Sequence, residues 1–204
     1  MSFRLHIDDL PAGLDFGSAV AVDTETLGLN PNRDRLCVVQ LSRGDGTAEV
    51  VQIRRDGPRP DRLLQLLAEP AVTKIFHYAR FDLAILCKTY GVMPGPVYCT
   101  KIASRLVRTY TDRHGLKDLV RELLGIDLSK QQQSSDWGAD GLSEAQVAYA
   151  ASDVLHLHAL RDKLDAILVR EKRLDLAKAC FDFLPTRARL DLGGWGEDDI
   201  FAHS

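Results

Sequence analysis

The chain has 204 residues and a mass of 22.7 kDa, which allows one domain with a sizeable core and leaves little room for a second. Hydrophobic residues make up 45% and charged residues 27% of the sequence, which excludes a disordered or fibrous chain. A net charge of -3 and a pI near 6.1 disfavour a protein that coats long nucleic acid, but a local basic pocket for short anionic ligands stays compatible with them.

The first elements along the chain are predicted to be strands. Residues 18–22 are apolar and β-compatible, and residues 37–43 and 47–53 predict two more strands around a turn at Gly44, Asp45 and Gly46. We expect these three strands to form an antiparallel meander. Residues 62–68 predict a short helix, residues 72–77 a strand, and residues 81–91 an amphipathic helix that ends at Gly91.

Helical patterns dominate after the loop at residues 93–97. Helices are predicted at 101–107, at 115–125 and over a long stretch that begins at Ser143, where Gln146 three residues later completes a capping box. Residues 184–204 contain one proline and three glycines, too many breakers for a long helix. Strands followed by helices predict an α/β fold with a mixed central sheet flanked by helices.

The cellular setting is predicted from cysteine spacing and hydropathy. The four cysteines lack C-x-x-C spacing, which argues against a zinc site and favours buried, reduced thiols. No apolar run approaches the length of about 18 residues that suggests a membrane-spanning helix. We therefore expect a cytoplasmic protein without membrane contact.

Two carboxylates in the segment VDTET could share a metal ion. Asp23 and Glu25 are two residues apart in a predicted strand, so both point to the same face. This signal is weak alone, because 29 acidic residues in 204 give about four acidic-x-acidic triplets by chance. A solvated strand end is the alternative.

Two further carboxylates lie at the beginning of one helix and within another. Asp82 follows the strand at 72–77, where an acid that interacts with the helix dipole is the alternative interpretation. Asp153 lies in a helix whose apolar positions cover most of its circumference, with Tyr149 one turn earlier on the same face. An acidic pair on a strand with single acids on two helices is what a two-metal phosphodiesterase requires.

The segments VDTET, HYARFD and YAASD resemble the three exonuclease motifs of the DEDD superfamily, in the tyrosine subgroup that includes ribonuclease D. The segments DRHGLKDL, KQQQSSDW and DIFAHS resemble the nanoRNase C family, which degrades RNA dinucleotides and forms ring-shaped octamers. These resemblances imply an RNase H-like fold, one 3′–5′ exonuclease domain over residues 1–190, and a tail over 191–204 at a subunit interface. A homo-oligomer is expected for the same reason.

The resemblance also implies roles for individual residues. Asp23, Glu25, Asp82 and Asp153 would bind two Mg²⁺ or Mn²⁺ ions, and Tyr149 would orient the attacking water. In the histidine subgroup the base lies five residues before the last aspartate, a position occupied here by Ala148. The expected products are nucleoside 5′-monophosphates.

Several side chains are candidates for contact with RNA. His77, Tyr78 and Phe81 could stack on bases, or could belong to the core. The resemblance implies that Leu27 is an apolar wedge between bases, whereas a locally packed loop leucine is the alternative. The expected substrate-binding residues are Thr24, Leu27, His77, Tyr78, Arg80, Phe81, Lys101, Lys130 and Gln133.

Three functions remain open from the sequence. The favoured one is a metal-dependent 3′–5′ exoribonuclease that hydrolyses very short RNA, mostly dinucleotides. A general ribonuclease D-type exonuclease that trims RNA 3′ ends or single-stranded DNA is the second. An inactive nucleic-acid-binding module is the third, and the intact set of four acids and a tyrosine disfavours it.

Overall fold

A computed structural model describes residues 2–128 and 135–203 of the protein. Its strands are β1 (Ser2–Ile7), β2 (Ala19–Thr26), β3 (Leu36–Ser42), β4 (Thr47–Gln52), β5 (Thr73–Phe76) and β6 (Val97–Cys99). Its helices are α1 (Asp61–Ala68), α2 (Ala79–Tyr90), α3 (Thr100–Val107), α4 (Leu116–Leu124), α5 (Glu144–Leu155), α6 (Leu157–Arg170) and α7 (Leu174–Leu192). The predicted α/β class is confirmed.

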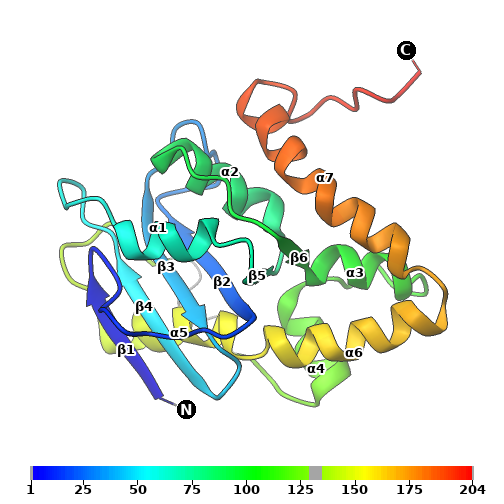
Figure 1. Cartoon of the computed structure of the whole chain (residues 1–204), viewed down its shortest axis with the longest axis horizontal. Coiled ribbons are helices and arrows are strands. Elements are labelled where there is room, and N and C mark those ends of the chain that lie inside the picture. Colours follow the sequence, from blue (N-terminus) through cyan, green and yellow to red (C-terminus); the bar gives the residue numbers. More distant parts are fainter. Residues whose placement is uncertain (1, 129–134, 204) are drawn as a thin grey trace.

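The strands form one mixed sheet in the order β1-β4-β3-β2-β5-β6. The meander β2-β3-β4 is antiparallel, as predicted, while β1 is parallel to β4 and β5 is parallel to both β2 and β6. Helix α5 lies along one face of the sheet, and α1 and α2 lie over the other (Figure 1). Helices α3, α4, α6 and α7 gather beyond β6. The core includes buried residues on both faces of β2 and β3, which are covered by helices on each side.

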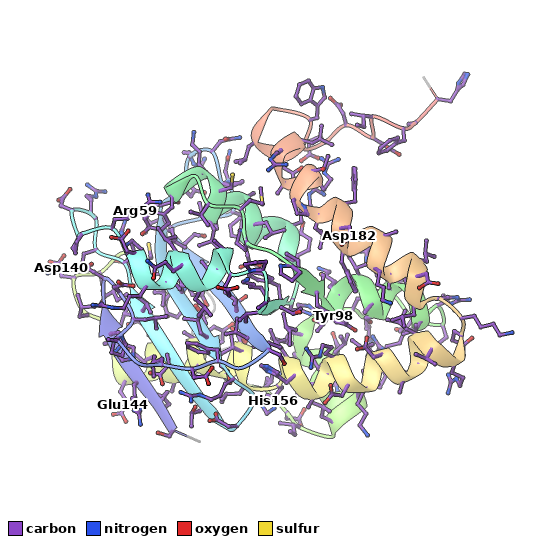
Figure 2. The ribbon with its side chains drawn as sticks, viewed as in Figure 1. Arg59, Tyr98, Asp140, Glu144, His156 and Asp182 are labelled. Atoms are coloured by element: carbon purple, nitrogen blue, oxygen red, sulfur yellow. The ribbon has the colours of Figure 1, made fainter. Side chains whose placement is uncertain are left out.

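Local signals placed several helix ends correctly. The Ser143 hydroxyl accepts a hydrogen bond from the Gln146 backbone N–H, and Gln146 Oε1 accepts one from the Ser143 backbone N–H, which confirms the capping box. Helix α2 ends at Gly91, whose φ of 71° is a conformation that glycine adopts without strain. The predicted long helix is nevertheless divided at His156 into α5 and α6. Figure 2 labels Glu144 and His156 at the two ends of α5.

Two strands escaped the sequence analysis because both depend on partners distant in the chain. Strand β1 is a largely exposed edge strand that pairs with β4. Strand β6 has only three residues and follows Gly95 and Pro96 in a segment that reads as a loop. Tyr98 on β6 packs on Phe181 with ring centroids 4.6 Å apart, and its hydroxyl donates to Asp165 Oδ1 over 2.8 Å (Figure 2).

The expectation that residues 184–204 cannot belong to a long helix is wrong for residues 184–192. Helix α7 continues through Pro185 to Leu192, and therefore crosses the predicted domain boundary at residue 190. A proline inside a helix costs about 3 kcal/mol. The buried side chains of Phe181, Leu184 and Ala188, on one face of α7, stabilise the helix across this position.

Cysteine burial follows the prediction in part. Cys37 and Cys99 are buried free thiols, while Cys87 and Cys180 are only partly covered. Within the described ranges, no helix has the length and apolar character needed to span a lipid bilayer.

Candidate active site

Three carboxylates from β2 and α5 meet at one position. Asp23 and Glu25 share a face of β2 because side chains alternate along a strand, and α5 packs against the sheet here. One oxygen each from Asp23, Glu25 and Asp153 lie within 4.8 Å of one another. Carboxylate oxygens at this separation can coordinate a hard divalent cation such as Mg²⁺ or Mn²⁺.

The fourth carboxylate approaches from α2. Thr24, between the two acids of β2, points to the opposite face, and its hydroxyl donates to Asp82 Oδ1 over 2.7 Å. Because β2 and β5 are parallel, the helix that follows β5 begins at the edge where β2 ends. Asp82 is 3% exposed and lies in the first turn of α2, where the helix dipole also favours its charge.

Tyr149 and Asp153 face this cluster from one side of α5. The capping box begins the helix at Glu144 and thereby sets the rotation that brings both residues to the sheet. The Tyr149 phenol and the Asp153 carboxyl group are near enough for each to shift the pKa of the other. Burial and the neighbouring acids, Asp153 first, raise the pKa of the Tyr149 phenol, so the hydroxyl keeps its proton at neutral pH.

The four carboxyl groups all have raised pKa values because burial disfavours their charged forms. The pKa of Asp82 and that of Asp153 rise to about 7. The pKa of Glu25 rises to about 8 through burial and repulsion by Asp153 and Asp82, and that of Asp23 lies well above its ordinary value for the same reasons. Without a bound cation this cluster resists full ionisation.

The cleft around these acids has a volume of about 720 Å³, and its described lining includes no lysine or arginine. Among the described lining residues, none supplies positive charge to the four carboxylates, and a bound cation would compensate their ionised forms. An all-oxygen donor set with one cluster of three converging carboxylates fits divalent metal ions. Three of the four predicted metal ligands, Asp23, Glu25 and Asp153, form this cluster, and Asp82 lines the same cleft outside it.

Five predicted substrate-binding residues line the same cleft with the acids. Leu27, His77, Tyr78 and Phe81 form its walls together with Thr24. Leu27 is 48% and Tyr78 45% exposed, whereas Phe81 packs partly on the core. Exposed apolar and aromatic surface beside a set of acids is suited to contact with bases.

His77 and Tyr78 occupy constrained positions at the turn between β5 and α2. The Nδ1 atom of His77 lies 2.9 Å from Thr100 Oγ1, and burial, with a smaller effect from Lys101, lowers the pKa of His77 to about 3. His77 is therefore neutral at physiological pH and can offer no cation to a phosphate. Tyr78 has a φ of 69°, a left-handed conformation that is uncommon for a bulky residue and costs about 1–2 kcal/mol.

Other predicted substrate-binding residues lie elsewhere. Arg80 points away from the acids and forms a bidentate ion pair with Asp191 at 2.6 and 2.7 Å, and it also donates to the Gly196 carbonyl. Lys101 lies 4.3 Å from the centroid of the Tyr78 ring, in a neighbouring groove that it lines with Arg105. Lys130 and Gln133 lie outside the described residues.

Among the unpredicted residues of the site, Gln40 and Trp137 contact predicted catalytic residues. Gln40 is fully buried on β3, and its Nε2 donates to Asp23 Oδ2 over 2.8 Å. A glutamine inside the apolar run LCVVQLS was the available signal. Trp137 lines the cleft, with its ring centroid 6.1 Å from that of Tyr149. Only its place in the segment KQQQSSDW pointed to it.

Comparisons with known proteins agree with this geometry. A family model described as a 3′-5′ exonuclease matches residues 8–169. A ribonuclease D from Acidiphilium cryptum is 40% identical over 156 residues, which are 76% of this chain but 39% of that protein's length. Structures of Brucella melitensis NrnC with bound Mg²⁺ and bound to pGG are 58% and 59% identical, cover 100% of both chains, and superpose with TM-scores of 0.96 and 0.97.

Proposed function

Because the chain belongs to the 3′–5′ exonuclease family, we propose that it is a metal-dependent exoribonuclease that hydrolyses very short RNA, preferably dinucleotides, to nucleoside 5′-monophosphates. The observation that carries the proposal is the convergence of four carboxylates and Tyr149 in one cleft that has no described lysine or arginine in its lining. The similarity to NrnC bound to pGG supports a short substrate.

The residues of the cleft suit hydrolysis of a phosphodiester bond. Asp23, Glu25 and Asp153 would hold one divalent ion, and Asp82 would help to hold a second. Two such ions would lower the pKa of the attacking water and stabilise the departing 3′ oxygen. Gln40 orients Asp23, and Thr24 orients Asp82, through the two hydrogen bonds at 2.8 and 2.7 Å.

Tyr149 orients the attacking water in this proposal. Its raised pKa means that the phenol remains protonated, so it cannot accept the proton of the water. Its hydroxyl can accept one hydrogen bond from that water while it donates to Asp153. The packing of Trp137 on Tyr149 limits the positions that the phenol ring can adopt.

One experiment tests chemistry and substrate length together. The purified protein is incubated with end-labelled RNA and DNA of two, three, five and ten nucleotides, with Mg²⁺ or Mn²⁺, and the products are resolved by length. We expect rapid hydrolysis of RNA dinucleotides and slow hydrolysis of longer chains. Equal rates at all RNA lengths would favour the general exonuclease, and no cleavage with either metal would favour the binding module.

A homo-oligomer is part of the proposal, and the ring-shaped octamer is its specific form. Support comes from apolar side chains exposed on α7 and the tail, namely Leu176, Phe183, Trp195, Ile200 and Phe201. The tail also contacts its own chain, because Arg187 donates to the Trp195 and Gly196 carbonyls. Removal of residues 197–204 should reduce the mass measured by light scattering, and an unchanged mass would exclude this segment from the interface.

A further inference from the structure

Leu27 separates two cavities of the molecule. It follows the bulge at the end of β2, two residues after Glu25. Its side chain lines the acid cleft and also a second cavity of about 540 Å³ that lies between the loop after β4 and the loop before α5. The second cavity is lined by Arg35, Arg54 and Arg55 as well as by acidic residues. Among the described residues, Leu27 is the one that lines both cavities.

Gly138 lies directly behind Leu27. The loop that contains it, in which Asp140 is labelled in Figure 2, is joined to β4 by a hydrogen bond of 2.9 Å from Gln52 Nε2 to the Ala139 carbonyl. A Cβ atom added to Gly138 would lie 2.6 Å from Leu27 Cδ2. Carbon atoms in contact are separated by about 3.5–4.0 Å, so the two groups cannot both remain in place.

The backbone at Gly138 does not itself require glycine. It is not among the described residues with positive φ, so alanine can adopt its conformation. The remaining neighbours of the added Cβ are Asp136 Oδ1 at 3.3 Å and an Arg35 guanidinium nitrogen at 3.5 Å, which small adjustments accommodate. The conflict is therefore specific to Leu27.

We propose that Gly138 is a positioning residue that sets how far Leu27 projects into the acid cleft. The absence of a side chain lets the Leu27 methyl rest against the loop, which keeps the cleft open for a short RNA. The inference rests on the proposed function, because it takes the acid cleft as the RNA site.

The residues that line the two cavities indicate in which direction Leu27 would move in Gly138→Ala. Gly138 lines the second cavity alone, whereas Leu27 lines both. Gly138→Ala therefore moves Leu27 away from the loop and toward the acids. We expect KM for an RNA dinucleotide to rise several-fold with kcat largely retained, because the carboxylates and Tyr149 keep their places.

The experiment compares Gly138→Ala with Gly141→Ala, a matched control in the same loop whose added Cβ meets nothing within 4 Å. Both changes are repeated in a Leu27→Ala background, which lacks the Cδ2 atom. We expect Gly138→Ala to raise KM above that of the parent protein and Gly141→Ala to leave it unchanged. In the Leu27→Ala background, adding Gly138→Ala should cause no further change in KM. A KM equal to that of the control, or a rise that persists without Leu27, would overturn the proposal.

A readout without catalysis separates this inference from the proposed function. Leucine-methyl NMR, with the Leu27 signals assigned from Leu27→Val, reports the surroundings of Leu27 directly. Gly138→Ala should shift these signals and Gly141→Ala should not. Unshifted Leu27 signals would reject the role of Gly138, whatever substrate the enzyme hydrolyses. A parent protein that cleaves no RNA would reject the proposed function, and the NMR shift would still test the contact between Gly138 and Leu27.

Discussion

Replacement of Asp82 by asparagine should stabilise the metal-free protein while it weakens metal binding. Asp82 is buried, and its pKa is raised from 3.8 to about 7. A folded-state pKa above the unfolded value means that stability falls as pH rises from about 4 to 7. The shift corresponds to at most about 4 kcal/mol of destabilisation above pH 7, and sharing of protons among the four acids reduces this figure.

Asp82→Asn removes the charge but keeps an oxygen that can accept the Thr24 hydrogen bond. Urea unfolding at pH 8 with a chelator should therefore show a gain of about 2–4 kcal/mol in unfolding free energy. At pH 5 the gain should fall to less than half, because the folded parent is then protonated at Asp82. Saturating Mg²⁺ should stabilise the parent more than the variant, since the ligand set is incomplete in the variant.

Asp191→Asn is the control with the opposite sign. Although burial opposes it, the ion pairs with Arg80 and Arg187 keep the pKa of Asp191 below its ordinary value, so this carboxylate stabilises the fold above pH 4. Its loss should destabilise the protein equally at pH 8 and pH 5. If Asp82→Asn also destabilised the chelated protein at pH 8, or if its gain did not depend on pH, the argument from buried charge would be refuted.

Three further changes test individual contacts. Tyr149→Phe should lower kcat by about 10²-fold or more while calorimetry shows unchanged Mg²⁺ affinity, and an unchanged kcat would remove its role with water. Thr24→Val removes the hydrogen bond to ionised Asp82, so the apparent pKa of the acidic limb of the pH–rate profile should rise by about one unit. An unchanged apparent pKa would show that Asp82 does not determine this limb. Asparagine tolerates the left-handed backbone of residue 78, so Tyr78→Asn should change the unfolding free energy by no more than about 1 kcal/mol. The loss of the aromatic ring should raise KM for the RNA dinucleotide, because a base can no longer stack on it. An unchanged KM would show that the bases do not bind at Tyr78.

Long-range contacts explain where the structure departs from the sequence pattern. Arg80 and Lys101 read as cations close to the acids along the chain, yet the structure turns Arg80 to Asp191, 111 residues away, and places Lys101 behind Tyr78. Strand β6 exists because Tyr98 reaches α6 and α7, and α7 passes Pro185 because its apolar face is buried. None of these partners is close in sequence.

The amino-acid sequence by itself determined the local geometry of the site. Alternation along β2 put Asp23 and Glu25 on one face, and helical spacing with the capping box put Tyr149 and Asp153 on another. These relations depend on residues within one or two turns of each other, and so a periodic pattern contains them. Only the tertiary structure decided that the two faces meet, that Thr24 and Gln40 orient the acids, and that Gly138 lies behind Leu27. Those contacts depend on the parallel pairing of β2 with β5 and on the packing of α5 against the sheet, which join segments far apart in the chain.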